Sequence, residues 1–218
     1  EVSPGQDKRA DGYSVSYSRF PIGPVLAIAP YNWPYNLAAH KIAPALAAGN
    51  TIVLKGSPMA SLCTLSLARL IHECGCPPGV LNSVTCEPGP SERMAIDPRT
   101  VMVSLTGSPK VGWHLKKLCW DKQVTLELGG SAFALVQPDA DLPAAAKALA
   151  LSAFGYAGQV CISAQNALVH EDVAERFRNL LAEETRAIVT GDPTKEDTVC
   201  GPLINAEAVF RVQEWIAQ

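Results

Sequence analysis

Cys161 is the residue whose type and setting point most directly to chemistry. It follows a run of small residues in FGYAGQVCISAQ (154–165). A cysteine thiolate is a strong nucleophile once a neighbouring base or cation lowers its pKa. The alternative is an inert thiol, because free cysteine is among the most buried residue types. Taken alone, Glu127 and Asn32 are weaker signals still, since a strand-end glutamate is usually solvated and an asparagine before a proline usually bonds to the turn.

The elements that must position these residues alternate along the chain. Period-two and short apolar runs predict strands, and amphipathic runs with capping signals predict helices. We expect Pro44 to kink or break the helix predicted over 34–50. This order predicts an α/β fold, a mostly parallel sheet with helices on both faces, and an internal boundary near Gly129-Gly130. The predicted strands are 12–20, 23–30, 51–55, 79–84, 100–107, 123–130 and 164–171, and the predicted helices are 34–50, 62–75, 108–118, 141–154 and 172–189.

Ligands of such sheets bind at the carboxyl ends of the strands. The polar residues at or just after these strand ends are Asn32, Lys55, Thr106, Ser108 and Glu127. There is no G-x-G-x-x-G motif, but LTGSPKVG (105–112) joins a strand to a helix whose free amides favour an anion. The other interpretation of Thr-Gly-Ser before a helix is a turn and its cap.

Composition limits the classes of function. The chain has 218 residues, of which 48% are hydrophobic and 18% charged, enough for a sizeable core. The net charge of −3 gives no basic surface for nucleic acid or an anionic membrane. We find neither an apolar run of membrane-spanning length nor a signal-peptide pattern. Seven scattered cysteines favour free thiols in a reducing compartment, and hence a cytoplasmic protein.

Two further groups of residues imitate functional motifs. HECGC (72–76) brings a histidine close to two cysteines, but the spacing is wrong for a zinc knuckle and no second ligand pair follows. We therefore predict no metal site. His170 follows Cys161 by nine residues, yet local spacing does not define a catalytic cysteine–histidine dyad, and a surface histidine is the better interpretation.

Five separated stretches, in this order, resemble the aldehyde dehydrogenase superfamily. They are PIGPVLAIAPYNWPYNLAAHKIAPALAAGNTIVLK, SLTGSPKVG, TLELGG, GYAGQVC and GDPTKEDTVCGPLI. The resemblance implies a Rossmann-like domain without G-x-G-x-x-G. It assigns residues 1–21 to an oligomerisation strand region, 22–128 to an NAD(P)-binding domain and 129–218 to part of a catalytic domain. Both ends look cut, so we expect a fragment of a longer parent that forms a homodimer or homotetramer, and we expect the piece alone to be inactive or poorly stable.

The same resemblance implies a role for each site residue. Cys161 is similar in position to the nucleophile that adds to an aldehyde, and Asn32 to the amide that binds the resulting oxyanion. Glu127 matches the base that activates water for thioester hydrolysis, which favours a carboxylic acid product over transfer to coenzyme A. The implied contacts of the NAD or NADP cofactor are Ala29, Pro30, Lys55, Ser57, Thr106, Gly107, Ser108, Leu128, Gly129 and Gln159.

Some positions depart from the family pattern. Gly56 stands where a proline usually follows the ribose-binding lysine, and Pro58 stands where many NAD-preferring members carry a glutamate. The choice between NAD and NADP therefore stays open. The stretch 86–98, which the resemblance places over the adenine, is shorter than usual. The motifs are most similar to the branch that acts on lactaldehyde and phosphonoacetaldehyde, which only hints at the substrate.

Two other functions remain open at this stage. A truncated member could keep the fold and bind only nucleotide or a partner subunit. A cofactor-free cysteine hydrolase would use the same thiolate and oxyanion site to cleave an ester. Lys55 and the Thr-Gly-Ser turn argue against the hydrolase, and reduction of NAD(P) by an aldehyde would separate all three readings.

Overall fold

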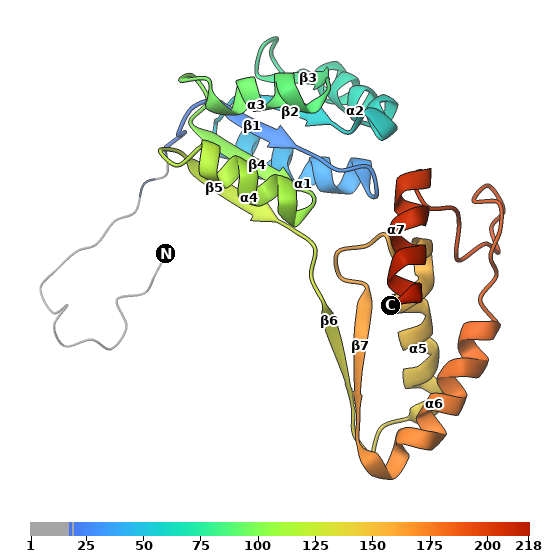
Figure 1. The fold of residues 1–218 in the computed structure, drawn as a ribbon. Helices are drawn as coiled ribbons and strands as arrows, with labels where there is room; N and C mark the ends of the chain where they lie inside the picture. Colours follow the sequence, from blue (N-terminus) through green and yellow to red (C-terminus); the bar gives the residue numbers. More distant parts are fainter. Residues whose placement is uncertain (1–17, 19) are drawn as a thin grey trace, which may run out of the picture. The chain divides into compact units, whose positions relative to one another are not determined.

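A computed structural model describes residues 18 and 20–218 of the chain. They divide between Glu127 and Leu128 into two compact units, each with its own hydrophobic core (Figure 1). The strand predicted over 12–20, like the oligomerisation region assigned to 1–21, lies almost wholly outside the described residues.

The first unit contains one parallel five-stranded sheet with the order β3-β2-β1-β4-β5. Its elements are β1 (Val25–Ile28), α1 (Pro34–Ala47), β2 (Ile52–Gly56), the 3-10 helix η2 (Pro58–Ala60), α2 (Ser61–Glu73), β3 (Leu81–Thr85), α3 (Pro88–Ile96), β4 (Met102–Thr106), α4 (Pro109–Leu118) and β5 (Gln123–Glu127). The α/β fold predicted from the sequence is confirmed.

Helices cover both faces of this sheet. On one face, Ala27 and Leu54 pack with Ala38 and Ile42 of α1, and all four side chains are buried. Figure 1 shows α1 behind the sheet and α3 and α4 in front of it. Burial on both sides explains why β1 is apolar at every position, since a strand between two helical layers has no solvent-facing side.

Two features of this unit differ from the sequence prediction. The helix α1 continues through Pro44 and ends one turn later, at Ala47, so the expected break is absent. The residues over 88–96 form α3, although their prolines and glycine predicted no helix. Pro88 occupies the start of α3, where the missing amide costs no hydrogen bond, which explains why a proline-rich stretch can be helical.

The second unit pairs two parallel strands and packs helices against them. Its elements are β6 (Ala132–Val136), α5 (Leu142–Phe154), the 3-10 helix η3 (Gly155–Gly158), β7 (Ala164–Val169), α6 (Glu171–Arg186) and α7 (Ala206–Ala217). Phe177 of α6 is 1% exposed and packs with Val136 and Leu142. Asp141 caps α5 by accepting a hydrogen bond from the amide of Ala144 at 3.1 Å. The strand β6 was not predicted from the sequence.

Candidate active site

The carboxyl edge of the sheet begins with the residues that follow β1. The amide of Ala29 donates to the carbonyl of Lys55 at 3.0 Å, so β1 stays in register with β2 just beyond its last residue. Pro30 ends that pairing. Asn32 lies in the short loop before α1, half-buried, with its side-chain oxygen Oδ1 buried. The parallel order of the strands thus brings Asn32 and Lys55 to the same edge.

Glu127 reaches this edge at the end of β5. Its register partner is Thr106 on β4, and its carbonyl accepts a hydrogen bond from the amide of Gly107 at 3.0 Å. The side chain of Glu127 is exposed, so solvent reaches the carboxylate within this unit. Thr106, Gly107 and Glu127 are therefore neighbours, as their positions at the carboxyl ends of neighbouring strands predicted.

Ser108 forms the cap of α4. Its hydroxyl oxygen accepts a hydrogen bond from the amide of Val111 at 3.4 Å, and Pro109 occupies the first turn. This is the capping role that the sequence also allowed. The start of α4 still directs amides toward the carboxyl edge, so the predicted phosphate contact at Gly107 and Ser108 stays a prediction.

Lys55 is the next-to-last residue of β2 and Ser57 directly follows the strand, and between them Gly56 makes a close packing contact. A β-carbon on Gly56 would lie 2.2 Å from Oγ1 of Thr64, so position 56 faces α2 and leaves no room for a side chain. Neighbouring strand residues face opposite sides, and Lys55 therefore points toward the α3 and α4 face. Ser57 accepts a hydrogen bond from the amide of Met59 at 3.3 Å and caps the 3-10 helix.

Lys41 is a buried charged residue that sequence reasoning missed. It is 8% exposed, and its ammonium group donates to Oγ of Ser104 at 3.1 Å. Burial lowers the pKa of Lys41 to about 8, and the negative charge of Glu127 opposes that shift. The sequence signal for this burial is the helical spacing of three residues, because Ala38, Lys41 and Ile42 form one buried stripe of α1.

Cys161 lies in the second unit, on the turn between η3 and β7. The residue is exposed, so Cys161 is not a buried thiol within the described chain, and its role as the nucleophile stays a prediction. Tyr156 and Ala157 have φ values of 57° and 56°, a left-handed conformation that non-glycine residues rarely adopt. Strained backbone of this kind is found at functional sites, where the surrounding structure holds it in place.

The side chain of Gln159 anchors this turn. Its Nε2 donates to the carbonyl of Pro202 at 3.3 Å, and its Oε1 accepts from the amide of Ile204 at 2.9 Å. Ser163, which is buried, donates to the carbonyls of Ser152 and Ala153 at 3.1 Å each. The turn that carries Cys161 is thus tied on both sides, which fixes where its thiol is presented.

The glycines that follow β5 lie close to the same turn. A β-carbon on Gly130 would be 3.8 Å from the carbonyl oxygen of Cys161, and that glycine's own carbonyl accepts from Nε2 of Gln165 at 2.7 Å. Leu128 and Gly129 directly precede this contact. The second unit therefore brings Cys161 together with the Gly129–Gly130 segment and Gln159, three of the sequence-predicted positions.

The predicted site residues thus form two groups. Asn32, Lys55, Thr106, Ser108 and Glu127 share one edge of the sheet in the first unit. Cys161 and Gln159, with the segment 128–130, share one turn in the second unit. Neither unit by itself contains the nucleophile together with the predicted base and oxyanion donor.

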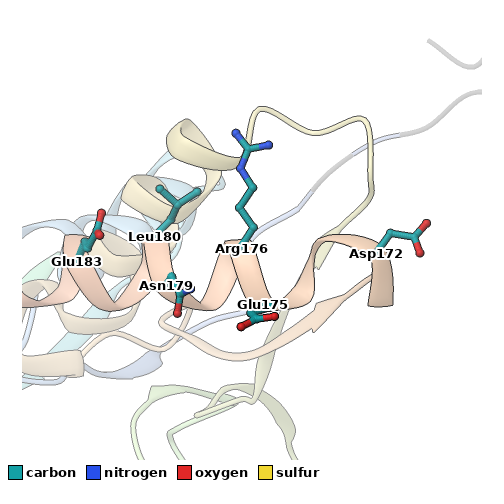
Figure 2. Close-up of a pocket in the computed structure, with 6 residues that line it drawn as sticks. All are labelled: Asp172, Glu175, Arg176, Asn179, Leu180 and Glu183. Carbon is teal, nitrogen blue, oxygen red and sulfur yellow. The ribbon is translucent and has the colours of Figure 1, made fainter.

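Hollows elsewhere on the surface involve other residues. Figure 2 shows one along the helix α6, and it is lined by Asp172, Glu175, Arg176, Asn179, Leu180 and Glu183. No residue predicted for the site lines that groove. A second hollow follows β3 and borders α3, and its lining is Val84, Cys86, Pro90, Arg93, Met94 and Asp97. Since Val84 is the register partner of Lys55, this second hollow lies beside the end of β2.

Over residues 18 and 20–218, no cluster of three or more histidine, cysteine or acidic side chains is placed to hold a metal ion. Within that same part of the chain, every helix is too short or too polar to cross a membrane.

Comparison with known proteins identifies the family. The model of the aldehyde dehydrogenase family matches residues 3–218, and the chain belongs to this family. It is 39% identical over 219 residues to a 3-sulfolactaldehyde dehydrogenase of Priestia megaterium, covering 100% of this chain and 45% of that protein. It is 39% identical over 224 residues to a lactaldehyde dehydrogenase of Methanocaldococcus jannaschii, covering 99% and 46%. The chain thus spans less than half the length of these relatives.

Solved structures agree with this assignment. A glyceraldehyde-3-phosphate dehydrogenase from Methanocaldococcus jannaschii, complexed with NADP, matches with a TM-score of 0.88 and 40% identity, over 92% of this chain and 45% of that one. An aldehyde dehydrogenase from Mycobacterium tuberculosis, complexed with NAD+, matches with a TM-score of 0.89 and 35% identity, over 92% and 42%. The resemblance drawn from the five motifs is confirmed.

Proposed function

We propose that this chain contributes the nucleophile, the base and the cofactor-binding edge of an NAD(P)-dependent aldehyde dehydrogenase that forms carboxylic acids. The observation that carries the proposal is the exposed thiol of Cys161 on a left-handed, doubly anchored turn. A nucleophilic thiol has to be accessible to its substrate and fixed in position by the surrounding structure. A structural cysteine needs neither property.

Each catalytic residue has one role in this proposal. The sulfur of Cys161 bonds to the aldehyde carbon, and the side-chain amide of Asn32 donates to the oxyanion that forms. Loss of hydride from the adduct leaves a thioester on the sulfur. Glu127 then takes a proton from water, which attacks the thioester carbon and releases the acid and the thiolate. The exposed carboxylate of Glu127 is accessible to that water.

The residues at the sheet edge fit a dinucleotide. The start of α4 directs amides at an anion, as a pyrophosphate requires, and Gly107 and Ser108 would hold it there. The hollow at Val84 and Arg93 borders Lys55 and would hold the adenosine end. Ala29, Pro30, Ser57 and Thr106 would complete the contacts, together with Leu128, Gly129 and Gln159. The cofactor, when bound, supplies the hydride acceptor.

The relatives support a short, oxygenated aldehyde as substrate. Several of them are named for lactaldehyde, 3-sulfolactaldehyde or sulfoacetaldehyde. We infer the same class for this chain. We assign residues 22–128 to cofactor binding and 129–218 to the start of a catalytic domain. A cytoplasmic homodimer or homotetramer of the parent protein completes the proposal.

A second candidate is a non-catalytic domain that binds only nucleotide or a partner subunit. The observation that favours it is that neither compact unit by itself contains Cys161 together with Asn32 and Glu127. The two candidates differ in one measurement. The purified protein is mixed with lactaldehyde and related aldehydes in the presence of NAD or NADP, and the reduced cofactor is followed by absorbance.

Glu127→Gln and Cys161→Ser provide the diagnostic variants. Glu127→Gln should lower turnover by roughly 10²- to 10⁴-fold while a first burst of reduced cofactor survives, because only hydrolysis needs the base. Cys161→Ser should lose the burst as well. Nucleotide binding without any reduction by the unmodified protein would favour the non-catalytic candidate, and ester cleavage without cofactor would favour a hydrolase.

A further inference from the structure

Gln159 lies two residues before Cys161 and directs both ends of its side-chain amide at backbone groups. Its Nε2 donates to the carbonyl of Tyr156 at 3.2 Å and to that of Pro202 at 3.3 Å. Its Oε1 accepts a hydrogen bond from the amide of Ile204 at 2.9 Å. The chemical steps proposed above make no use of these three bonds, so the side chain has a role that those steps do not describe.

The side-chain amide fits this place in one orientation only. Rotating it by half a turn would set Oε1 against two carbonyl oxygens and would leave the amide of Ile204 facing an NH2 group. The position therefore needs one acceptor and one group with two donors, at the distance that glutamine provides. Ionised glutamate offers acceptors only, and methionine has nearly the same length but no donor.

The segment 199–204, which receives this side chain, is itself fastened to the second unit. The amides of Val199 and Cys200 both donate to the carbonyl of Val189, at 3.0 and 3.1 Å. The amide of Gly191 donates to the carbonyl of Cys200 at 3.2 Å. Val189 follows the helix α6, which packs in the core of this unit. The segment is therefore a support that is continuous with the core.

The bonds to this segment act on the left-handed part of the turn. The φ values of Tyr156 and Ala157 cost free energy, because both residues carry a β-carbon. The amide of Tyr156 donates to the carbonyl of Val199 at 2.9 Å, and its carbonyl accepts from Nε2 of Gln159. Both backbone polar groups of Tyr156 are thus held by the segment 199–204, one directly and one through Gln159.

We propose that Gln159 is a positioning residue for the nucleophile: the three bonds of its amide, the latch, fasten the turn to the segment 199–204 and so maintain the left-handed conformation that presents Cys161. On the other side of the thiol, Ser163 is fixed by its two bonds to carbonyls at the end of α5. This inference rests on the proposed function for its catalytic meaning, since Cys161 is the nucleophile assigned there. It gives Gln159 a second role beside the proposed cofactor contact.

The latch can be measured without enzyme activity. Hydrogen–deuterium exchange of the whole 218-residue protein, followed by mass spectrometry of its peptides, reports how often the turn opens. Gln159→Met removes the bonds of the amide and nearly keeps the length of the side chain. We expect exchange over 156–163 to become about tenfold faster, while peptides of α5 and α6 keep their rates. Gln159→Glu retains only the acceptor and should behave like Gln159→Met.

Gln213→Met is the matched control. It makes the same chemical change at an exposed position of α7, in the same unit, and should leave exchange over 156–163 unchanged. Circular dichroism establishes that each variant is folded. Unchanged exchange of the turn in Gln159→Met overturns the proposal. An equal rise over the turn, α5 and α6 overturns it too, because that result means a general loss of stability.

Ala157→Gly tests whether the latch works against backbone strain. Glycine adopts a positive φ without the cost that a β-carbon imposes, so it should favour the left-handed turn even when the latch is absent. We therefore expect Ala157→Gly, added to Gln159→Met, to restore part of the lost protection from exchange. Exchange that stays as fast or becomes faster in the double variant would overturn the proposal.

Kinetics separate the latch from the proposed function. A small displacement of a nucleophile slows bond formation much more than it weakens substrate binding. Gln159→Met should therefore slow the first burst of reduced cofactor by about 10- to 100-fold with little change in KM, whereas Gln213→Met should keep the burst rate. An unchanged burst in Gln159→Met would overturn the positioning role. Faster exchange of the turn, in a protein that never reduces NAD or NADP, would support the latch and refute the assigned function instead.

Discussion

Replacing Gly56 with alanine should destabilise the first unit through one contact. The added β-carbon would lie 2.2 Å from Oγ1 of Thr64 and 2.9 Å from its Cβ and Cγ2 atoms. Thr64 is fully buried, and its hydroxyl donates to the carbonyl of Ser61 at 3.1 Å. Neither side chain can move away, so the end of β2 or the helix α2 has to shift.

The expected loss follows from two opposing effects. Overpacking a dense interior costs about 1–3 kcal/mol, and this contact is among the tightest that a single methyl group can make. Replacing glycine within a strand returns about 0.5–1 kcal/mol of backbone entropy. We therefore expect Gly56→Ala to lower the free energy of unfolding by about 2 kcal/mol, which corresponds to a fall of about 4–8 °C in Tm for a chain of this size.

Urea unfolding of a double-mutant cycle provides the assay. Thr64→Ala removes the atoms behind the shortest contact, so Gly56→Ala should cost at least 1 kcal/mol less, by rough estimate, in that background. Gly89→Ala is the matched control, because a β-carbon there meets nothing within 4 Å and should be neutral or stabilising. An equal cost of Gly56→Ala with threonine or alanine at position 64 would refute the reasoning.

Three further outcomes follow from the structure. Limiting iodoacetamide should alkylate Cys161 before Cys63, Cys76 and Cys119, as measured by peptide mass spectrometry, because Cys161 is exposed whereas Cys119 is buried and has a raised pKa. Faster labelling of Cys63, Cys76 or Cys119 would contradict this prediction. The pKa of Lys41 is about 8 in the folded protein and 10.5 ordinarily. Between these two pH values the unfolded chain binds more protons than the folded protein, so the free energy of unfolding rises with pH, by at most about 3 kcal/mol. Lys41→Met should flatten this pH dependence, as measured by urea unfolding at several pH values. An equally steep rise in the variant and in the unmodified protein would refute this prediction. Asp141→Ala should cost about 1 kcal/mol through loss of the α5 cap, whereas the same change at exposed Asp139 should cost nothing measurable.

Much of the first unit was predictable because its signals are local. The four residues of β1 are uniformly apolar, and Ser108 precedes α4 as a capping residue should. The helix α3 was not predictable in the same way, because proline and glycine signal turns unless the proline falls in the first helical turn. The strand β6 follows two glycines and is only five residues long, which is too short for a periodic pattern to stand out.

The candidate site was predictable in its members and not in its arrangement. Strand ends marked Lys55, Thr106 and Glu127, because parallel strands place their carboxyl ends at one edge. Lys41 was missed because a lysine in an alanine-rich helix is normally solvent-exposed, and only its spacing from Ala38 and Ile42 indicates burial. Cys161 was marked by its type and by the stretch GYAGQVC, but its exposure and the left-handed turn could not be predicted, because they depend on anchors more than 40 residues away.

The anchoring of that turn has a consequence for protein synthesis. Gln159 is held by Pro202 and by Ile204, which lies 45 positions further along the chain. At a translation rate of roughly 5–20 residues per second, the ribosome makes Ile204 about 2–9 seconds after Gln159. We therefore expect the nascent chain to carry an unanchored Cys161 thiol during that interval. Oxidation of the thiol to sulfenic acid, and capture by another thiol, would be most damaging at this stage, so newly made chains should be more sensitive to peroxide than finished ones.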